Sequence, residues 1–190
     1  MKKIVLMLAA LLLAMLANSQ NTYTMDKNHS RLVFSVMHFG ISHVEGNFKN
    51  FESSFKSSKD DFSDAVVEMT ADVASIDTDV EMRDKDLKSE KWFDAEKYPK
   101  ITFKSKSFKK ISDKKYKLEG DITIKGITKP ITFDVDYNGK AQNPMSKKNS
   151  VGFTVNGKLN RKDFNVGTGP SAGAVGDDVD VKANVEFIME

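Results

Sequence analysis

The chain has 190 residues, with 29 lysines and arginines against 27 aspartates and glutamates, and it contains no cysteine. The absence of cysteine excludes disulfides, thiol nucleophiles and thiolate metal sites. The nearly balanced charge provides no basic surface for neutralising phosphates, so we do not expect a nucleic-acid partner.

Residues 1–19 have the pattern of a secretory signal peptide. Two lysines precede a fourteen-residue apolar run (4–17), and small residues at positions 17 and 19 precede Gln20. The run is too short to span a bilayer comfortably, so we expect cleavage rather than a permanent anchor. The protein is therefore predicted to be secreted or periplasmic, with residues 20–190 forming one domain that has no net charge.

Period-two alternation of apolar and polar residues, which is typical of half-buried strands, recurs along the rest of the chain. The alternating segments are residues 31–39, 65–75, 101–107, 116–126, 131–137, 151–159 and 179–188. Turns are expected at Gly40, Gly46, 126–130, Asn138-Gly139 and Asn156-Gly157. The apolar faces predict an inward wall that includes Leu32, Phe34, Val36, His38, Phe48, Val67, Met69, Ile101, Phe103, Ile122, Ile124, Phe133 and Phe153.

Two segments depart from the strand pattern. In residues 77–99, Val80, Arg83, Leu87 and Trp92 have loosely helical spacing, so we predict one helix near residues 79–92 that ends before Pro99. Residues 167–178 are rich in glycine and poor in bulky side chains, which predicts a long flexible loop.

About eight antiparallel strands with one helix, and no alternation of strands and helices, indicate an all-β fold. A closed barrel whose interior holds one elongated ligand suits this length and pattern. The sequence pattern alone does not distinguish such a barrel from a sandwich.

Seven blocks, in order along the chain, resemble the YceI-like polyisoprenoid-binding family. They are DKNHSRLVFSVMHFGIS, SIDT, RDKDLKS with FDAEKYPKITFKS, LEGDITIKGITKPITFDV, VGF, NRKDFNV and GDDVDV. The chain departs from the usual pattern at Met37, where a basic residue is usual, and at Asn165, where a glycine is usual. These departures concern details of loops rather than the fold.

The resemblance implies a lipocalin-like, extended antiparallel β-barrel capped by a helix. It implies an exported, non-enzymatic protein that holds a polyprenyl phosphate or an isoprenoid quinone as cargo, with no catalytic residues and no other cofactor. It is also compatible with a homodimer.

Two residues are candidates for contacting the polar headgroup of such a lipid. His38 continues the inward series of its strand, whereas His43 follows the bend at Gly40 and is expected to be structural. Arg83 would either hold a headgroup oxygen at the mouth of the barrel or pair with Asp77 or Asp86 to fasten the helix.

Besides metal binding, which the sequence does not favour, three other hypotheses remain open. The histidine spacing matches no zinc pattern, so no metal site is predicted. The cargo could instead be another amphiphile, such as a fatty amide bound by a stress-related protein, and scattered serine, histidine and aspartate residues could form a lipid-ester hydrolase. The nine lysines of residues 97–117 either protect strand edges or provide a transient contact with anionic membrane surfaces.

Overall fold

The structure is a computed structural model that describes residues 21–169 and 172–190, so the predicted signal peptide lies outside the described residues. Within the described part of the chain, no helix is long and apolar enough to cross a membrane. The elements are β1 (Asn21–Met25), β2 (Arg31–His38), β3 (Ser42–Phe48), β4 (Phe51–Ser57), β5 (Val66–Asp72), η1 (Val73–Ser75), β6 (Ile76–Asp77), α2 (Glu81–Lys88), β7 (Lys100–Ser112), β8 (Lys115–Ile124), β9 (Ile127–Gln142), β10 (Asn149–Asn160), η2 (Arg161–Phe164) and β11 (Val175–Met189).

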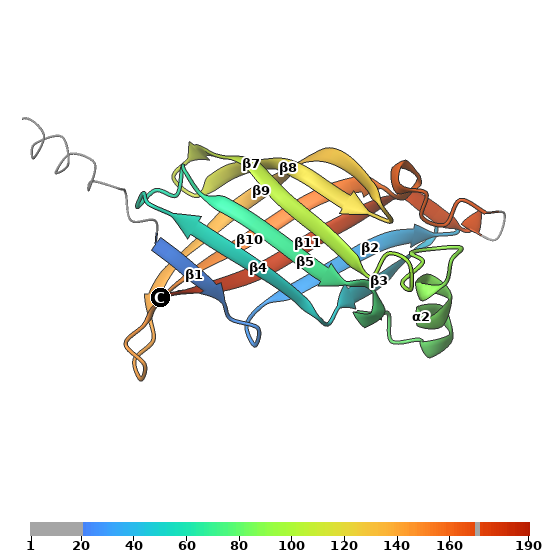
Figure 1. The fold of residues 1–190 in the computed structure, drawn as a ribbon, viewed down its shortest axis with the longest axis horizontal. Coiled ribbons are helices and arrows are strands. Elements are labelled where there is room, and N and C mark those ends of the chain that lie inside the picture. The colour runs from blue at the N-terminus through green and yellow to red at the C-terminus, as the bar shows by residue number, and fades with distance from the viewer. Residues whose placement is uncertain (1–20, 170–171) are drawn as a thin grey trace, which may run out of the picture.

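The strands form one antiparallel sheet that closes on itself as an elongated barrel (Figure 1). The closed circuit runs β1-β4-β5-β7-β8-β9-β10-β11, and β11 returns to pair with β1. β2 and β3 extend the wall beyond β1 and β4, because β2 pairs with β11 and β3 pairs with β2. The predicted eight-strand antiparallel barrel with one helix is confirmed in the described residues.

Alternating burial explains why these segments form barrel strands. In β8, Tyr116, Leu118, Gly120, Ile122 and Ile124 are buried, whereas the residues that alternate with them are half-buried. A strand directs successive side chains to opposite faces, so an apolar residue at every second position gives each strand one inward face.

Aromatic side chains seal one end of the barrel, which we call the sealed end. The Phe55 ring, 1% exposed, lies 5.2–5.5 Å from the rings of Tyr23, Phe62, Phe153 and Phe187. Residues 58–65 fold over this cluster, and Tyr116 Oη donates a hydrogen bond to the Asp61 carbonyl oxygen at 2.9 Å. These contacts, of which two are edge-to-face, one is tilted and one is stacked, add to the free energy gained by burying the rings.

Several glycine-containing turns that the sequence predicts are strand positions instead. Gly46 lies within β3 and Gly157 lies within β10. A Cβ atom at position 46 would lie 2.4 Å from the Phe34 ring, and one at position 157 would lie 2.3 Å from the Phe133 ring. Each glycine therefore makes room for an inward aromatic ring rather than a turn. The turn expected at Gly40 is confirmed at residues 39–41.

The other two predicted turns also fall near or within strands. Asn138-Gly139 lies inside β9, beside a register shift between Gly152 and Phe153 that bends the strand pair. Within the predicted connector 126–130, only Gly126 is in a turn, which it forms with Lys125, and β9 already includes Pro130. Proline is tolerated there because this part of β9 pairs only with β8, and β10 pairs further along.

The irregular segments are shorter than the sequence predicts. The helix α2 covers residues 81–88 rather than 79–92, and residues 89–97 continue as turns and bends. The predicted loop 167–178 is wrong at its C-terminal side, because β11 begins at Val175 and its pairing with His38 extends the sheet. The sequence pattern also missed β1 and β4, in which serines and threonines hide the apolar alternation.

Asp64 is predicted to hold the segment over the sealed end. Its carboxylate accepts hydrogen bonds from Ser57 Oγ at 2.6 Å, from Ser58 N at 3.0 Å and from Lys59 N at 3.2 Å. Burial alone would raise the pKa of Asp64, but these hydrogen bonds, with one from Ser58 Oγ, hold it well below its usual value. The bonds therefore stabilise the fold at neutral pH, and this stabilisation is lost as the pH falls below about 4.

We expect Asp64→Asn to lower the free energy of unfolding at pH 7 by about 1–3 kcal/mol. Chemical denaturation measures this difference, which should shrink as the pH is lowered from 5 towards 3. Asp60→Asn, an exposed position in the same loop, is the control and should have little effect. Equal effects of the two substitutions would contradict the assigned role of Asp64.

Candidate functional site

The barrel interior contains a cavity of about 430 Å³ that is lined almost entirely by apolar side chains. Its walls come from every long strand, from α2 and from the segments that flank η2. This volume lies in the range of small-molecule binding sites, roughly 300–1,000 Å³. The inward side chains therefore leave part of the interior unfilled.

The structure places all thirteen residues of the predicted inward wall on this cavity. They are Leu32, Phe34, Val36, His38, Phe48, Val67, Met69, Ile101, Phe103, Ile122, Ile124, Phe133 and Phe153. That these residues contact a ligand remains a prediction. The sequence-based set omitted the cavity-facing residues of β11, although the same period-two alternation identifies them: Val179, Val181, Ala183, Val185 and Phe187.

The cavity extends from the aromatic cluster towards the opposite end of the barrel, which we call the open end. Lining residues beside the cluster, such as Phe55 and Phe108, are buried. Lining residues at the other extreme, including Val44, Leu87 and Val175, are only half-buried. The β2–β3 hairpin, α2 and the segment before β11 gather at this open end (Figure 1).

His38 lies at the open end, on the cavity wall. It is half-buried at the last position of β2 and pairs with Val175 of β11. Its ring meets the Phe39 ring edge-to-face, with 4.4 Å between centroids. Within the described residues, His38 is thus the one histidine on the cavity wall.

Arg83 also lines the cavity, but its hydrogen bonds differ from the pairing predicted with Asp77 or Asp86. Its Nε donates to Thr78 Oγ1 at 2.8 Å, and its Nη2 donates to the Thr78 carbonyl oxygen at 2.7 Å. Asp84 accepts from the backbone N and the hydroxyl of Thr78, at 2.9 and 2.6 Å. Thr78 therefore fastens α2 to the barrel, and no acceptor for Arg83 Nη1 lies among the described residues.

Asp77 and Asp86 have other partners. Asp77 pairs with Lys49, which lowers the pKa of its carboxyl group. Asp86 accepts a hydrogen bond from Trp92 Nε1 at 2.9 Å, and the indole packs in the core. The Trp92 indole therefore links α2 to the core.

Arg161, a cavity-wall arginine that is only 5% exposed, is not among the residues predicted from the sequence. Its guanidinium donates to the carbonyl oxygens of five residues, namely Val166, Gly167, Ala172, Val175 and Gly176. It also donates to Asp177 at 3.1 Å and lies 5.7 Å from the centre of the Trp92 ring. Positions 155, 157 and 159 of β10 face inward, and this parity places Arg161 inward as well.

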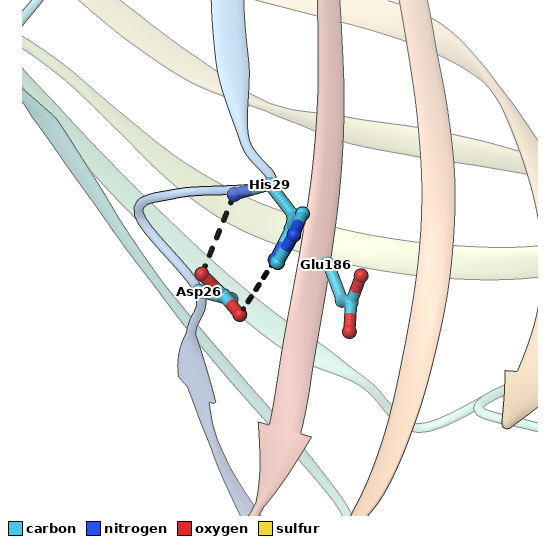
Figure 2. Close-up of side chains that lie close together, drawn as sticks. All are labelled: Asp26, His29 and Glu186. Atoms are coloured by element: carbon cyan, nitrogen blue, oxygen red, sulfur yellow. Dashed lines mark hydrogen bonds and ion pairs between the residues drawn. The ribbon is translucent and has the colours of Figure 1, made fainter. Parts of the chain in front are cut away.

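The third histidine belongs to a surface cluster away from the cavity (Figure 2). His29 Nδ1 lies 2.9 Å from Asp26 Oδ2, and the ligand atoms of Asp26, His29 and Glu186 lie within 4.8 Å of one another. The hydrogen bond with Asp26 raises the pKa of His29 and lowers that of Asp26. Asp26 also accepts from the backbone N of Asn28 at 2.9 Å, so the cluster closes the β1–β2 turn.

The two hydroxyl side chains on the cavity wall, those of Ser53 and Thr78, are engaged in structural hydrogen bonds. Ser53 Oγ donates to the Glu68 carbonyl oxygen at 2.9 Å, and the hydroxyl of Thr78 donates to Asp84. The serine–histidine hydrogen bond found in the described residues joins Ser35 and exposed His43 at 3.1 Å, outside the cavity. The expected structural role of His43 agrees with this contact.

The lysine-rich segment 97–117 forms a ladder of ion pairs on the outer surface rather than a basic patch. Its lysines pair with carboxylates mainly across β7, β8 and β9, through Lys100–Asp72, Lys104–Glu68, Lys106–Asp121, Lys109–Glu119, Lys110–Asp113, Lys115–Asp136 and Lys117–Asp134. Most of the positive charge of this segment is therefore neutralised in space, because lysines on one strand lie beside carboxylates on the neighbouring strand.

Residues 23–187 match the family model for the YceI-like domain. The chain belongs to the YceI-like family. A UPF0312 protein of Staphylococcus aureus (strain bovine RF122 / ET3-1) is 37% identical over 169 residues, which cover 87% of this chain and 96% of that protein.

Three solved structures resemble this barrel. BcnA of Burkholderia cenocepacia superposes with a TM-score of 0.76 at 30% identity, covering 85% of this chain and 98% of BcnA. The Campylobacter jejuni YceI protein gives a TM-score of 0.72 at 34% identity, over 79% of this chain and 87% of that one. A polyisoprenoid-binding domain from Saccharophagus degradans gives a TM-score of 0.64 at 11% sequence identity, covering 88% of this chain and 98% of that domain. At this low identity, the likeness shows the fold alone.

The structure also accounts for Asn165, a residue at which this chain departs from the usual family pattern. Asn165 ends the η2 turn in the left-handed conformation, with φ at 55°. Asparagine tolerates this conformation better than most residues other than glycine, so the turn is preserved.

Proposed function

We propose that this protein binds and carries a long-chain isoprenoid lipid, a polyprenyl phosphate or an isoprenoid quinone, without chemical conversion. The observation that carries the proposal is the apolar cavity of about 430 Å³, which is sealed at one end by aromatic rings. A tail that buries several hundred Å² there would gain about 10 kcal/mol before the entropic cost of binding is subtracted.

Membership of the YceI-like family supports a binding role. The Saccharophagus degradans domain is described as polyisoprenoid-binding, and the same fold here provides an elongated apolar interior. The cavity itself remains the stronger support, because a fold alone does not specify a ligand.

The headgroup of the lipid is proposed to lie at the open end, near His38 and Arg83. Both residues line the cavity where its walls are half-buried. A phosphate or quinone oxygen could accept a hydrogen bond from Arg83 Nη1 and from the imidazole. The tail would then extend towards the aromatic cluster at the sealed end.

We further propose that the protein acts outside the cytoplasm, after removal of residues 1–19. The charged n-region, the short apolar run and the small residues before Gln20 support this proposal. The intact mass of the protein recovered from the periplasm or medium should correspond to a chain that begins at Gln20. Recovery of the full-length chain from the cytoplasm alone would contradict the proposal.

The cargo can be identified by extracting the purified protein with organic solvent and analysing the extract by mass spectrometry. We expect a polyprenyl chain or a quinone in about one copy per protein. Ala183→Phe should lower the amount of bound lipid severalfold, because the phenyl ring would occupy the cavity that Ala183 lines.

Asn184→Phe is the matched control, since Asn184 is exposed on the outer face of the same strand. This variant should carry as much lipid as the unchanged protein. A fatty derivative in the extract would replace the isoprenoid proposal with another cargo. An empty protein that hydrolyses lipid esters would refute the carrier function.

His38→Leu is predicted to weaken the discrimination between lipids that share a tail but differ in headgroup. The substitution keeps the apolar wall and removes one polar group, so thermal unfolding should change little while the affinity ratio falls by about three- to tenfold. His43→Leu, outside the cavity, should leave that ratio unchanged. Unchanged discrimination in His38→Leu would assign His38 a purely structural role.

A further inference from the structure

The open end of the barrel carries exposed apolar side chains on two neighbouring elements. Phe39 and Ile41, at the tip of the β2–β3 hairpin, are 68% and 86% exposed, and Met82 in α2 is 83% exposed. Val80, which precedes α2, is also exposed. We call these four residues the apolar rim.

The apolar rim adjoins the mouth of the cavity. Phe39 follows His38, which lines the cavity, and contacts its ring. Met82 precedes Arg83, another lining residue, and Ala174, which also lines the cavity, accepts a hydrogen bond from the Phe39 backbone N at 2.7 Å. The hairpin and α2 lie together at this end of the barrel (Figure 1).

The hairpin tip holds its aromatic residue outward at a conformational cost. Phe39 has a positive φ of 50°, in the left-handed region that bulky residues disfavour. The backbone is fixed there by the hydrogen bond to Ala174 and by one from Ile41 N to the His38 carbonyl oxygen at 3.1 Å. A strained, exposed aromatic residue beside a ligand cavity indicates a role in function rather than in packing.

The tip is also uncharged. Residues 39–42 are Phe, Gly, Ile and Ser, and the lysine-rich strands of the barrel wall are paired with carboxylates. Electrostatic attraction to anionic lipids therefore offers little to this protein. Attraction through apolar side chains does not depend on lipid charge.

We propose that the apolar rim inserts into the interfacial region of an electrically neutral phospholipid bilayer, where it passes lipid between the membrane and the cavity. This inference rests on the proposed carriage of a lipid. A long isoprenoid tail is nearly insoluble in water, so its transfer is fastest along a continuous apolar path. The rim supplies that path because it joins the bilayer to the end of the cavity opposite the aromatic cluster around Phe55, where lining residues such as Val44, Leu87 and Val175 are half-buried.

The transfer of a fluorescent polyprenol from phosphatidylcholine vesicles to the purified protein tests this proposal. The double variant Phe39→Asn with Ile41→Thr removes the apolar tip but keeps the turn, because asparagine tolerates a positive φ and threonine retains the β-branch. We expect its transfer rate to fall about tenfold or more. Its lipid content at equilibrium and its melting temperature should be unchanged.

The matched control is the double variant Ile111→Thr with Met145→Thr. These residues, 61% and 90% exposed, lie on the hairpins at the sealed end, so the control removes a similar apolar area far from the cavity mouth. It should transfer lipid at the unchanged rate. Adding phosphatidylglycerol to the vesicles should accelerate transfer by less than about twofold, since lipid charge is not used.

The outcomes separate this proposal from the carrier function. If the unchanged protein takes up no polyprenol at any time and its solvent extract contains no isoprenoid lipid, the carrier function fails. If it takes up polyprenol and the rim variant transfers at the same rate, the rim proposal alone is overturned. The rim proposal is also overturned if transfer requires anionic lipid. It is overturned as well if sedimentation shows that the rim substitutions dissociate a dimer while the transfer rate stays the same, because the rim would then be a dimer interface.

Discussion

The buried guanidinium of Arg161 determines how the open end of this barrel is built. A buried charge is costly unless it is fully hydrogen-bonded, and Arg161 meets this condition with five backbone carbonyl oxygens and Asp177. These bonds hold the connection between β10 and β11 around one side chain, against the indole of Trp92. Polar contacts at the periphery therefore order this end, and the apolar interior beside it remains unfilled.

The two ends of the barrel are thus stabilised by different interactions. Aromatic rings centred on Phe55 fill the sealed end, where Asp64 closes the overlying segment. At the open end, Thr78 fastens α2 through Arg83 and Asp84, and the lining residues Val44, Leu87 and Val175 are only half-buried. A lipid tail that enters such a cavity has one direction available, which places its headgroup near His38 and Arg83 in the proposed complex.

On the outer surface, lysines that cluster along the sequence are paired with carboxylates in the folded barrel. Along the chain, lysines cluster in residues 97–117, and carboxylates are abundant in the preceding segment. The antiparallel sheet brings β7, β8 and β9 side by side, so most of these lysines meet a carboxylate. Exposed pairs of this kind contribute little stability, but they leave the barrel wall without a strongly positive face.

The sequence pattern by itself determined the all-β class, the inward wall and the approximate place of the helix, because period-two alternation and the helical spacing of residues 80–87 are local properties. The resemblance to the YceI-like family, rather than the alternation, favoured a barrel over a sandwich. The pattern also placed His38 inward, through the parity of its strand. Tertiary structure decided the rest. Gly46 and Gly157 are strand positions that accommodate the rings of Phe34 and Phe133. Arg83 donates a hydrogen bond to Thr78 rather than to a carboxylate. The cavity, too, exists only when eight strands close, since its volume depends on how well the side chains of distant strands fill the interior.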